Sequence, residues 1–248
     1  MCVRILPRSR STAEIIFTGE LAFGPELLLA MWAAGTAAAA AAVAWWQIVG
    51  PGYTWLTGAT VVAMGVGGGL LDPHPGTVLA TVAALLAVGT ARQRIPSTAL
   101  FAIAAAGFGV AASSAGSIPL AVTGSVALGG ITGEMLLGHW YLVSPQMPRW
   151  ALRKLDLVAV IGLLLDALLL GLAGILGGAG GLGAWIFAML GGVSILLMVA
   201  VWFALKESGY EGVMAATGLS YLAVLTSLGA TAVGRVLLSG DSSFIPLG

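Results

Sequence analysis

Long apolar runs fill most of the chain, and short polar or proline-containing segments separate them. A bilayer core about 30 Å thick is crossed by about 20 helical residues, because each residue of an α-helix rises about 1.5 Å. Eight runs approach that length, and the third is the shortest of them. The pattern predicts eight transmembrane helices, at residues 27–50, 53–71, 76–91, 97–115, 118–143, 152–178, 183–205 and 212–238.

Proline and glycine mark the joins between these runs, as in Gly50-Pro51-Gly52 and Ile118-Pro119. Proline lacks the backbone N–H and disfavours helix in the residue before it, so the joins are expected helix boundaries. The loops left over are only a few residues long. The prediction is therefore an all-α, polytopic integral membrane helical bundle, with one transmembrane domain at 27–238. Residues 1–26 are expected to form an N-terminal arm with an interfacial segment, and 239–248 a short tail.

The composition supports a membrane protein and excludes several other classes. Hydrophobic residues make up 59% of the chain and charged residues only 8%, whereas soluble domains carry roughly 25% charged residues. The outer surface must therefore face lipid or other apolar protein. A net charge of zero argues against a nucleic-acid partner. Because Cys2 is the single cysteine, and His74 and His139 are the only histidines, cysteine-ligated clusters and a two-haem cytochrome are excluded.

The basic residues predict an orientation. With eight spans, one side holds six basic residues in its loops: Arg92, Arg94, Arg149, Arg153, Lys154 and Lys206. The other side holds four: Arg4, Arg8, Arg10 and Arg235. Since basic loops favour the cytoplasmic side, both termini are expected outside. High Ala and Gly, with Arg far above Lys, indicate a bacterial source and hence the cell inner (cytoplasmic) membrane.

Small residues recur at helical spacing and indicate close helix packing. Pairs of Gly four residues apart occur at Gly65/Gly69, Gly129/Gly133, Gly174/Gly178 and Gly177/Gly181. In lipid, helices associate through close packing, and glycine lets two backbones approach. The pairs predict packing within the bundle, and contact with other membrane subunits is the alternative.

Four ionisable residues lie inside the predicted spans, where charge is costly and marks candidate functional sites. The four candidates are Glu134, Asp156, Asp166 and Arg235, while His139, Arg153 and Lys154 lie near the ends of their spans. Asp166, near mid-membrane, is expected to be neutral, paired or in a polar cavity. Asp156 and Asp166 are ten residues apart, about 80° around a helix, so both can line one side of a cavity. Such a cavity suits proton or cation movement.

The end of the fifth span holds a second candidate site. Glu134, His139, Trp140 and Tyr141 lie there, and the sixth span enters nearby with Arg153, Lys154 and Asp156. This group has two interpretations, a quinone-headgroup site with His as a near-neutral titrating group, or an anchor among lipid phosphates. Glu134 and His139 are about 140° apart around the helix, which weakens a metal site.

Two functions fit these features. The first is a haem-free membrane subunit of a respiratory or photosynthetic electron-transfer complex, with a quinone site near the end of the fifth span. The alternative is a small proton- or cation-coupled transporter or channel that uses Asp166 and Glu134. The expected ligands are bound lipids and, in the first case, quinone, with no covalently held cofactor. No catalytic motif is found, so the chain is not expected to be an enzyme on its own.

Overall fold

The computed structural model describes residues 23–114, 117–177 and 181–239. These residues form eight α-helices and no strand: α2 (Pro25–Trp46), α3 (Pro51–Leu71), α4 (Pro75–Gly89), α5 (Arg94–Ser113), α6 (Ile118–Val143), α7 (Trp150–Gly177), α8 (Leu182–Ala204) and α9 (Tyr210–Ser239). Seven of the eight are long and apolar enough to cross a membrane, and α4 is the shorter one. The predicted all-α helical membrane bundle is confirmed. Most of the predicted arm (1–26) and tail (239–248), and Gly178 of the predicted glycine pairs, lie outside the described residues.

Proline begins several of the helices, as the sequence predicts. Pro25, Pro51 and Pro75 each lie in the first turn, where a missing N–H costs nothing because that donor has no partner within the helix. The first helix departs from prediction, since α2 ends at Trp46 rather than at residue 50. Gln47 takes a left-handed conformation with φ 53°, and Gly50 is extended before α3. Residues 47–50 therefore form the link between two helices.

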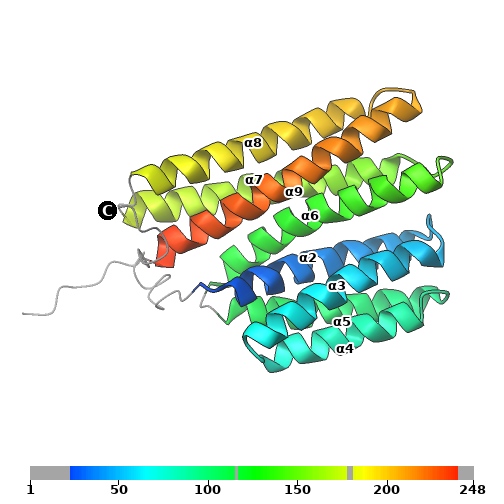
Figure 1. The fold of residues 1–248 in the computed structure, drawn as a ribbon, viewed down its shortest axis with the longest axis horizontal. Helices are drawn as coiled ribbons and strands as arrows, with labels where there is room; N and C mark the ends of the chain where they lie inside the picture. The colour runs from blue at the N-terminus through cyan, green and yellow to red at the C-terminus, as the bar shows by residue number, and fades with distance from the viewer. Residues whose placement is uncertain (1–22, 115–116, 178–180, 240–248) are drawn as a thin grey trace, which may run out of the picture.

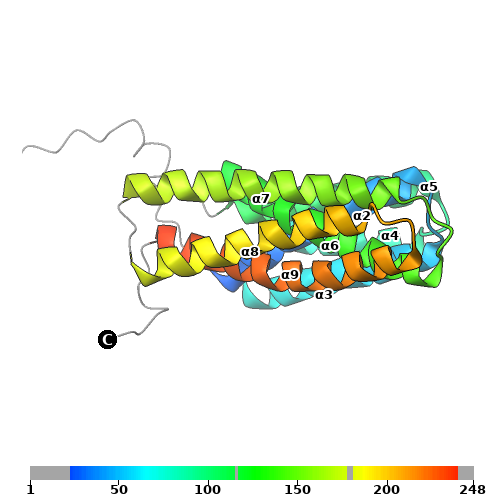
Figure 2. The same cartoon turned by 90° about the horizontal axis from the view of Figure 1, so that it is seen from above.

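The helices form two groups of four that meet side by side (Figure 1). One group holds α2 to α5 and the other α6 to α9, and α6 packs against α2 where the groups join. Both ends of the described chain lie at one end of the bundle, with the α6–α7 and α8–α9 loops at the other (Figures 1 and 2). An even number of antiparallel helices brings both ends of the described chain together in this way. The six basic loop residues of the sequence analysis belong to the latter end, which we call the basic end.

Glycine allows the two groups to touch through their backbones. A Cβ on Gly35 of α2 would lie 1.8 Å from the Ser125 carbonyl oxygen of α6, and a Cβ on Gly129 would lie 2.1 Å from the Gly35 carbonyl carbon. Only glycine fits at such contacts. Trp32 adds a hydrogen bond across the same interface, since its indole Nε1 donates to Thr132 Oγ1 at 2.7 Å. The predicted Gly129/Gly133 pair thus serves packing within the bundle.

Close packing also sets the register between α6 and α7. A Cβ on Gly130 would lie 2.7 Å from the Ala159 backbone, and a Cβ on Gly162 would lie 2.6 Å from the Ala127 backbone nitrogen. The two antiparallel helices therefore meet with residues near 130 opposite residues near 159. Extended along both helices, this register brings Glu134 level with Asp156.

Candidate functional site

The most unusual feature of the α6–α9 group is a pair of buried carboxyl groups. Glu134 of α6 and Asp156 of α7 are both fully shielded from the surface. The register of α6 and α7 places Asp156 level with Glu134. Neither residue takes part in an ion pair within the described part of the chain. We refer to these two residues as the carboxyl pair.

Glu134 contacts α9 through a single hydroxyl group. Ser220 Oγ hydrogen-bonds Glu134 Oε2 and also lies 2.8 Å from the Ala216 carbonyl oxygen, one turn earlier on α9. A serine hydroxyl has one proton to donate, so it cannot donate to both acceptors at once. The other carboxyl oxygen, Oε1, has no hydrogen-bond partner among the described residues. Glu134 therefore holds unused hydrogen-bonding capacity inside the bundle.

Asp156 is even less satisfied. Both of its carboxyl oxygens are buried without a hydrogen-bond partner in residues 23–114, 117–177 and 181–239. Its side chain borders a cavity of about 120 Å³ between α7 and α8, together with Val160, Val199 and Trp202. Arg153 lies three residues earlier on α7, and its Nη2 donates to the Leu205 carbonyl oxygen at 3.0 Å.

A second buried polar group lies toward the opposite end of the same four helices. Arg235 of α9 donates two hydrogen bonds to the Asp166 carboxylate of α7, at 2.7 and 3.0 Å. It also donates to the Leu120 carbonyl oxygen of α6 at 2.7 Å. Thr123 of α6 donates to the same carboxylate at 2.6 Å. Both charged side chains are buried. Of the states expected for Asp166, the structure therefore shows the paired one, with Arg235 as its partner.

A line of buried hydroxyl groups follows α9 from the level of the carboxyl pair toward Arg235. It consists of Thr217, Ser220, Ser227 and Thr231, and it ends at Arg235. The spacings of three, seven, four and four residues place all five side chains on one face of a helix. We call this face the hydroxyl stripe. The sequence analysis did not identify it, although its helical spacing in an apolar segment is visible in the sequence.

The aromatic candidates at the end of α6 do not gather around the carboxyl pair. His139 is exposed, and its Nδ1 lies 3.4 Å from the Tyr221 hydroxyl of α9. Trp140 packs edge-on against Tyr53 of α3, with ring centroids 6.5 Å apart. Tyr141 is buried, and its hydroxyl accepts a hydrogen bond from Arg149 at 3.4 Å. Glu134 and His139 thus lie on different faces of α6, as their spacing predicts.

Two basic residues near the start of α7 donate hydrogen bonds to the loop between α8 and α9. Arg149 donates to the carbonyl oxygens of Glu207, Ser208 and Gly209, and Arg153 donates to that of Leu205. These carbonyls follow the end of α8, where helical partners are missing. Lys154 does not take part in these loop contacts, because it lies over the rings of two tryptophans on the other side of α7.

The two histidines lie at opposite ends of the bundle, as the eight-span arrangement predicts. His74 precedes α4, and its Nδ1 accepts a hydrogen bond from the Gly76 backbone nitrogen at 3.0 Å. His139 is near the basic end. Throughout the part of the chain that the structure describes, no three His, Cys, Asp or Glu side chains come together as a metal site would require.

Comparison with protein-family models, with curated proteins and with solved structures finds no match to this chain. The fold and the composition define a multi-pass helical membrane protein. Its function must be argued from the buried polar groups themselves.

Proposed function

We propose that this protein moves protons across the membrane through its α6–α9 group. The observation that carries the proposal is the carboxyl pair: two buried carboxyl groups on facing helices, neither of which forms an ion pair with a described residue. An unpaired carboxylate in apolar surroundings is very costly, whereas a carboxyl group that binds a proton is neutral. A carboxyl group in that position is therefore suited to binding and releasing a proton, and not to carrying a permanent negative charge.

The hydroxyl stripe provides a route along α9 for the movement of protons. A hydroxyl group both donates and accepts a proton, so it can pass one along a hydrogen-bonded chain. Ser220 already bonds Glu134, and the stripe leads from there to Asp166 and Arg235. Along α9 the stretch from Ser220 to Ser227 rises about 10 Å, too far for a direct bond, so the route requires water between them.

The proton is favoured over a metal cation by the number of ligands. A hard cation such as Ca²⁺ takes about six to eight oxygen ligands. The carboxyl pair and Ser220 supply at most five oxygens, one fewer than the minimum, whereas a proton needs only one acceptor. The Asp166–Arg235 ion pair is expected to seal the far end of the route until a proton reaches the carboxylate.

The test is proton flux into liposomes that contain the purified protein and an internal pH-sensitive dye. A potassium gradient with valinomycin drives the flux. Glu134→Gln and Asp156→Asn keep the size of each side chain but cannot carry the proton, and each is expected to lower the flux at least tenfold. Glu211→Gln, at an exposed position at the start of α9, is the matched control and should leave the flux unchanged.

Equal flux in the wild type, in Glu134→Gln and in Asp156→Asn would refute the proposal, provided that each variant elutes as a folded, helical protein. Flux that is absent in the wild type as well would refute it directly.

A quinone-binding subunit of an electron-transfer complex is the second candidate, and His139 favours it. The His139 ring and the Tyr221 hydroxyl lie together on an exposed part of α6 and α9, about 6 Å along the helix from the end of α6. Such a pair can hydrogen-bond the carbonyl oxygens of a quinone that approaches through the lipid. His139 shares α6 with Glu134 of the carboxyl pair, which would then exchange the quinone's protons.

Decylubiquinone, added to the purified protein in detergent, tests this candidate through quenching of tryptophan fluorescence. His139→Ala and Tyr221→Phe are expected to weaken quenching about fivefold or more, the loss of one useful hydrogen bond. His74→Ala, at the opposite end of the bundle, is the control. If all three variants quench like the wild type, His139 is not a quinone ligand.

A further inference from the structure

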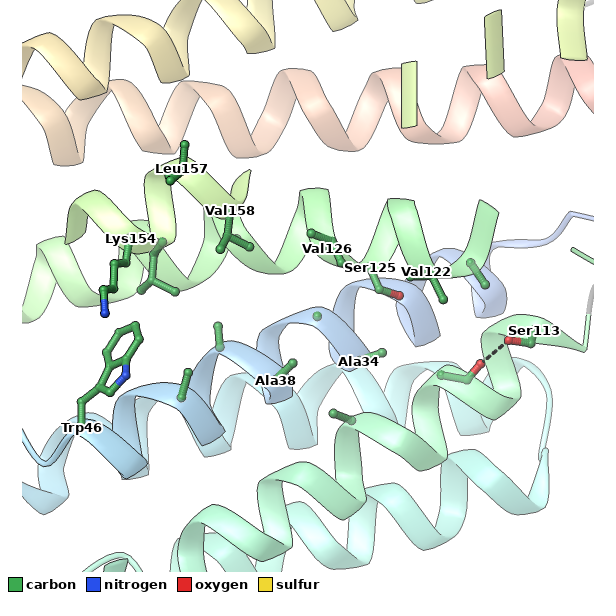
Figure 3. Close-up of a pocket in the computed structure, with 18 residues that line it drawn as sticks. Ala34, Ala38, Trp46, Ser113, Val122, Ser125, Val126, Lys154, Leu157 and Val158 are labelled. Atoms are coloured by element: carbon green, nitrogen blue, oxygen red, sulfur yellow. Dashed lines mark hydrogen bonds between the residues drawn. The ribbon is translucent and has the colours of Figure 1, made fainter. Parts of the chain in front are cut away.

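An apolar groove runs along the bundle between its two groups of helices, on the outer side of α2 and α6 (Figure 3). Its volume is about 510 Å³, and α2, α5, α6 and α7 all contribute to its wall. Alanine and glycine form half of the lining, so the wall is open because its side chains are small. The groove lies apart from the carboxyl pair, which faces the interior of the α6–α9 group.

The length of the groove matches one leaflet of a bilayer. It extends along α2 from Trp46 to Ala34, a rise of about 18 Å, whereas half of a hydrocarbon core is about 15 Å. A volume of 510 Å³ over that length gives a mean cross-section of about 28 Å². The groove is therefore long and narrow, as an unbranched hydrocarbon chain requires.

One end of the groove carries a positive charge at the depth of lipid headgroups. Lys154 lies there with Trp46, and Figure 3 shows the two side chains facing one another. The Lys154 Nζ is 5.8 Å from the Trp46 ring centroid and 4.8 Å from that of Trp150. Lys154 is exposed and forms no ion pair with any residue that the structure describes. Tryptophan and lysine together are typical of the headgroup region.

The rest of the groove offers little to a polar ligand. Apart from Trp46 and Lys154, only Ser113 and Ser125 contribute polar side chains. The Ser113 hydroxyl already donates to the Gly109 carbonyl oxygen at 2.7 Å. A ligand that fits must therefore be apolar along its length and negatively charged at one end.

We propose that this groove binds one acyl chain of an anionic phospholipid, with the phosphate of its headgroup at Lys154. The bound chain fills the space between the two groups of helices in the leaflet at the basic end. The ammonium group attracts the phosphate, and the two tryptophans hold the lysine in place.

The test measures lipid that remains bound to the purified protein, by native mass spectrometry with added phosphatidylglycerol or phosphatidylcholine. Lys154→Gln is expected to lower phosphatidylglycerol binding about fivefold, the factor for one basic side chain at a membrane surface. Lys206→Gln is a matched control, because Lys206 also lies over aromatic rings at the basic end but outside the groove, and it should bind like the wild type.

Filling the groove gives a second, independent measurement. Ala38 is an exposed lining residue, so Ala38→Leu obstructs the groove without disturbing the core, and both lipids should be lost. Ala215→Leu, at an exposed position of α9 outside the groove, should retain them. Undiminished phosphatidylglycerol in Lys154→Gln, or in a helical Ala38→Leu protein, would overturn the proposal. So would a neutral quinone found in place of the phospholipid and unaffected by Lys154→Gln.

Discussion

The buried Asp166–Arg235 ion pair predicts an asymmetric response to substitution. A carboxyl group that loses its partner can become neutral by binding a proton, but a guanidinium group stays charged in proteins. Asp166→Asn leaves that charge buried in the bundle, whereas Arg235→Gln leaves a carboxyl group that can neutralise itself. We therefore expect Asp166→Asn to be the more destabilising substitution.

The magnitude follows from the contacts. Arg235 and Asp166 share two hydrogen bonds between charged groups, at 2.7 and 3.0 Å, and both side chains are buried. Hydrogen bonds to charged groups contribute about 1.5–3 kcal/mol each, and removing one partner of a buried pair costs about 3–5 kcal/mol. Asp166→Asn is expected near the upper end of that range and Arg235→Gln near the lower end. The apolar double variant Asp166→Leu/Arg235→Met removes both charges and should be far more stable than either single variant.

Equilibrium unfolding in mixed micelles of dodecyl maltoside and sodium dodecyl sulfate, followed by circular dichroism, measures these differences. Asp72→Asn is the control, because Asp72 is exposed after α3, and its unfolding should change by less than about 0.5 kcal/mol. If Asp166→Asn unfolds at the same detergent fraction as Asp72→Asn, the pair does not stabilise the bundle. If the double variant is as unstable as Asp166→Asn, the buried unpaired charge of Arg235 is not the cause of the lost stability.

Three further predictions concern the packing of the helices and of one loop. Gly35→Ala places a Cβ against the α6 backbone and should lower the thermal unfolding temperature by several degrees, whereas Gly171→Ala, whose Cβ meets nothing within 4 Å, should not lower it. Trp32→Phe removes the hydrogen bond between α2 and α6, and double-mutant cycles with its threonine partner should give a coupling of about 0.6 kcal/mol. Arg149→Gln removes the donor to three loop carbonyls, so hydrogen exchange in the α8–α9 loop should accelerate by about tenfold, and unchanged protection would contradict that role.

Most of the fold is readable from the sequence because lipid imposes a length on each helix. The span predicted at 118–143 coincides with α6, since Pro119 begins it and Pro145 follows it. The first span was placed too long because residues 47–50 are apolar enough to continue a helix, although Gly50 and Pro51 require a link. Composition therefore predicts the approximate length of a membrane-spanning helix well, but it predicts the residue at which a turn begins less well.

The candidate site was only partly predictable, because its partners come from distant segments. Asp166 stood out as an isolated charge, but its pairing with Arg235 depends on the register between α7 and α9, which no local pattern contains. Lys154 and Asp156 are two residues apart, about 200° around a helix, and they face opposite sides of α7. Their closeness in the sequence predicts one shared site at a membrane surface, whereas Lys154 borders the groove and Asp156 faces α8.

The difference in length between α4 and α9 has a consequence for the surrounding membrane. The 15 residues of α4 rise about 22 Å, which is less than the thickness of a hydrocarbon core of about 30 Å. The 30 residues of α9 rise about 45 Å, which is more than that thickness. Val78, Leu79, Val82, Leu85 and Leu86 of α4 are exposed, so lipid tails meet this short helix directly. A short span is accommodated by thinning of the bilayer, at a cost of fractions of a kcal/mol per Å, so we expect a thinner bilayer beside α4 than beside α9. Short-chain lipids, or neighbours with short spans, are then expected to collect beside α4.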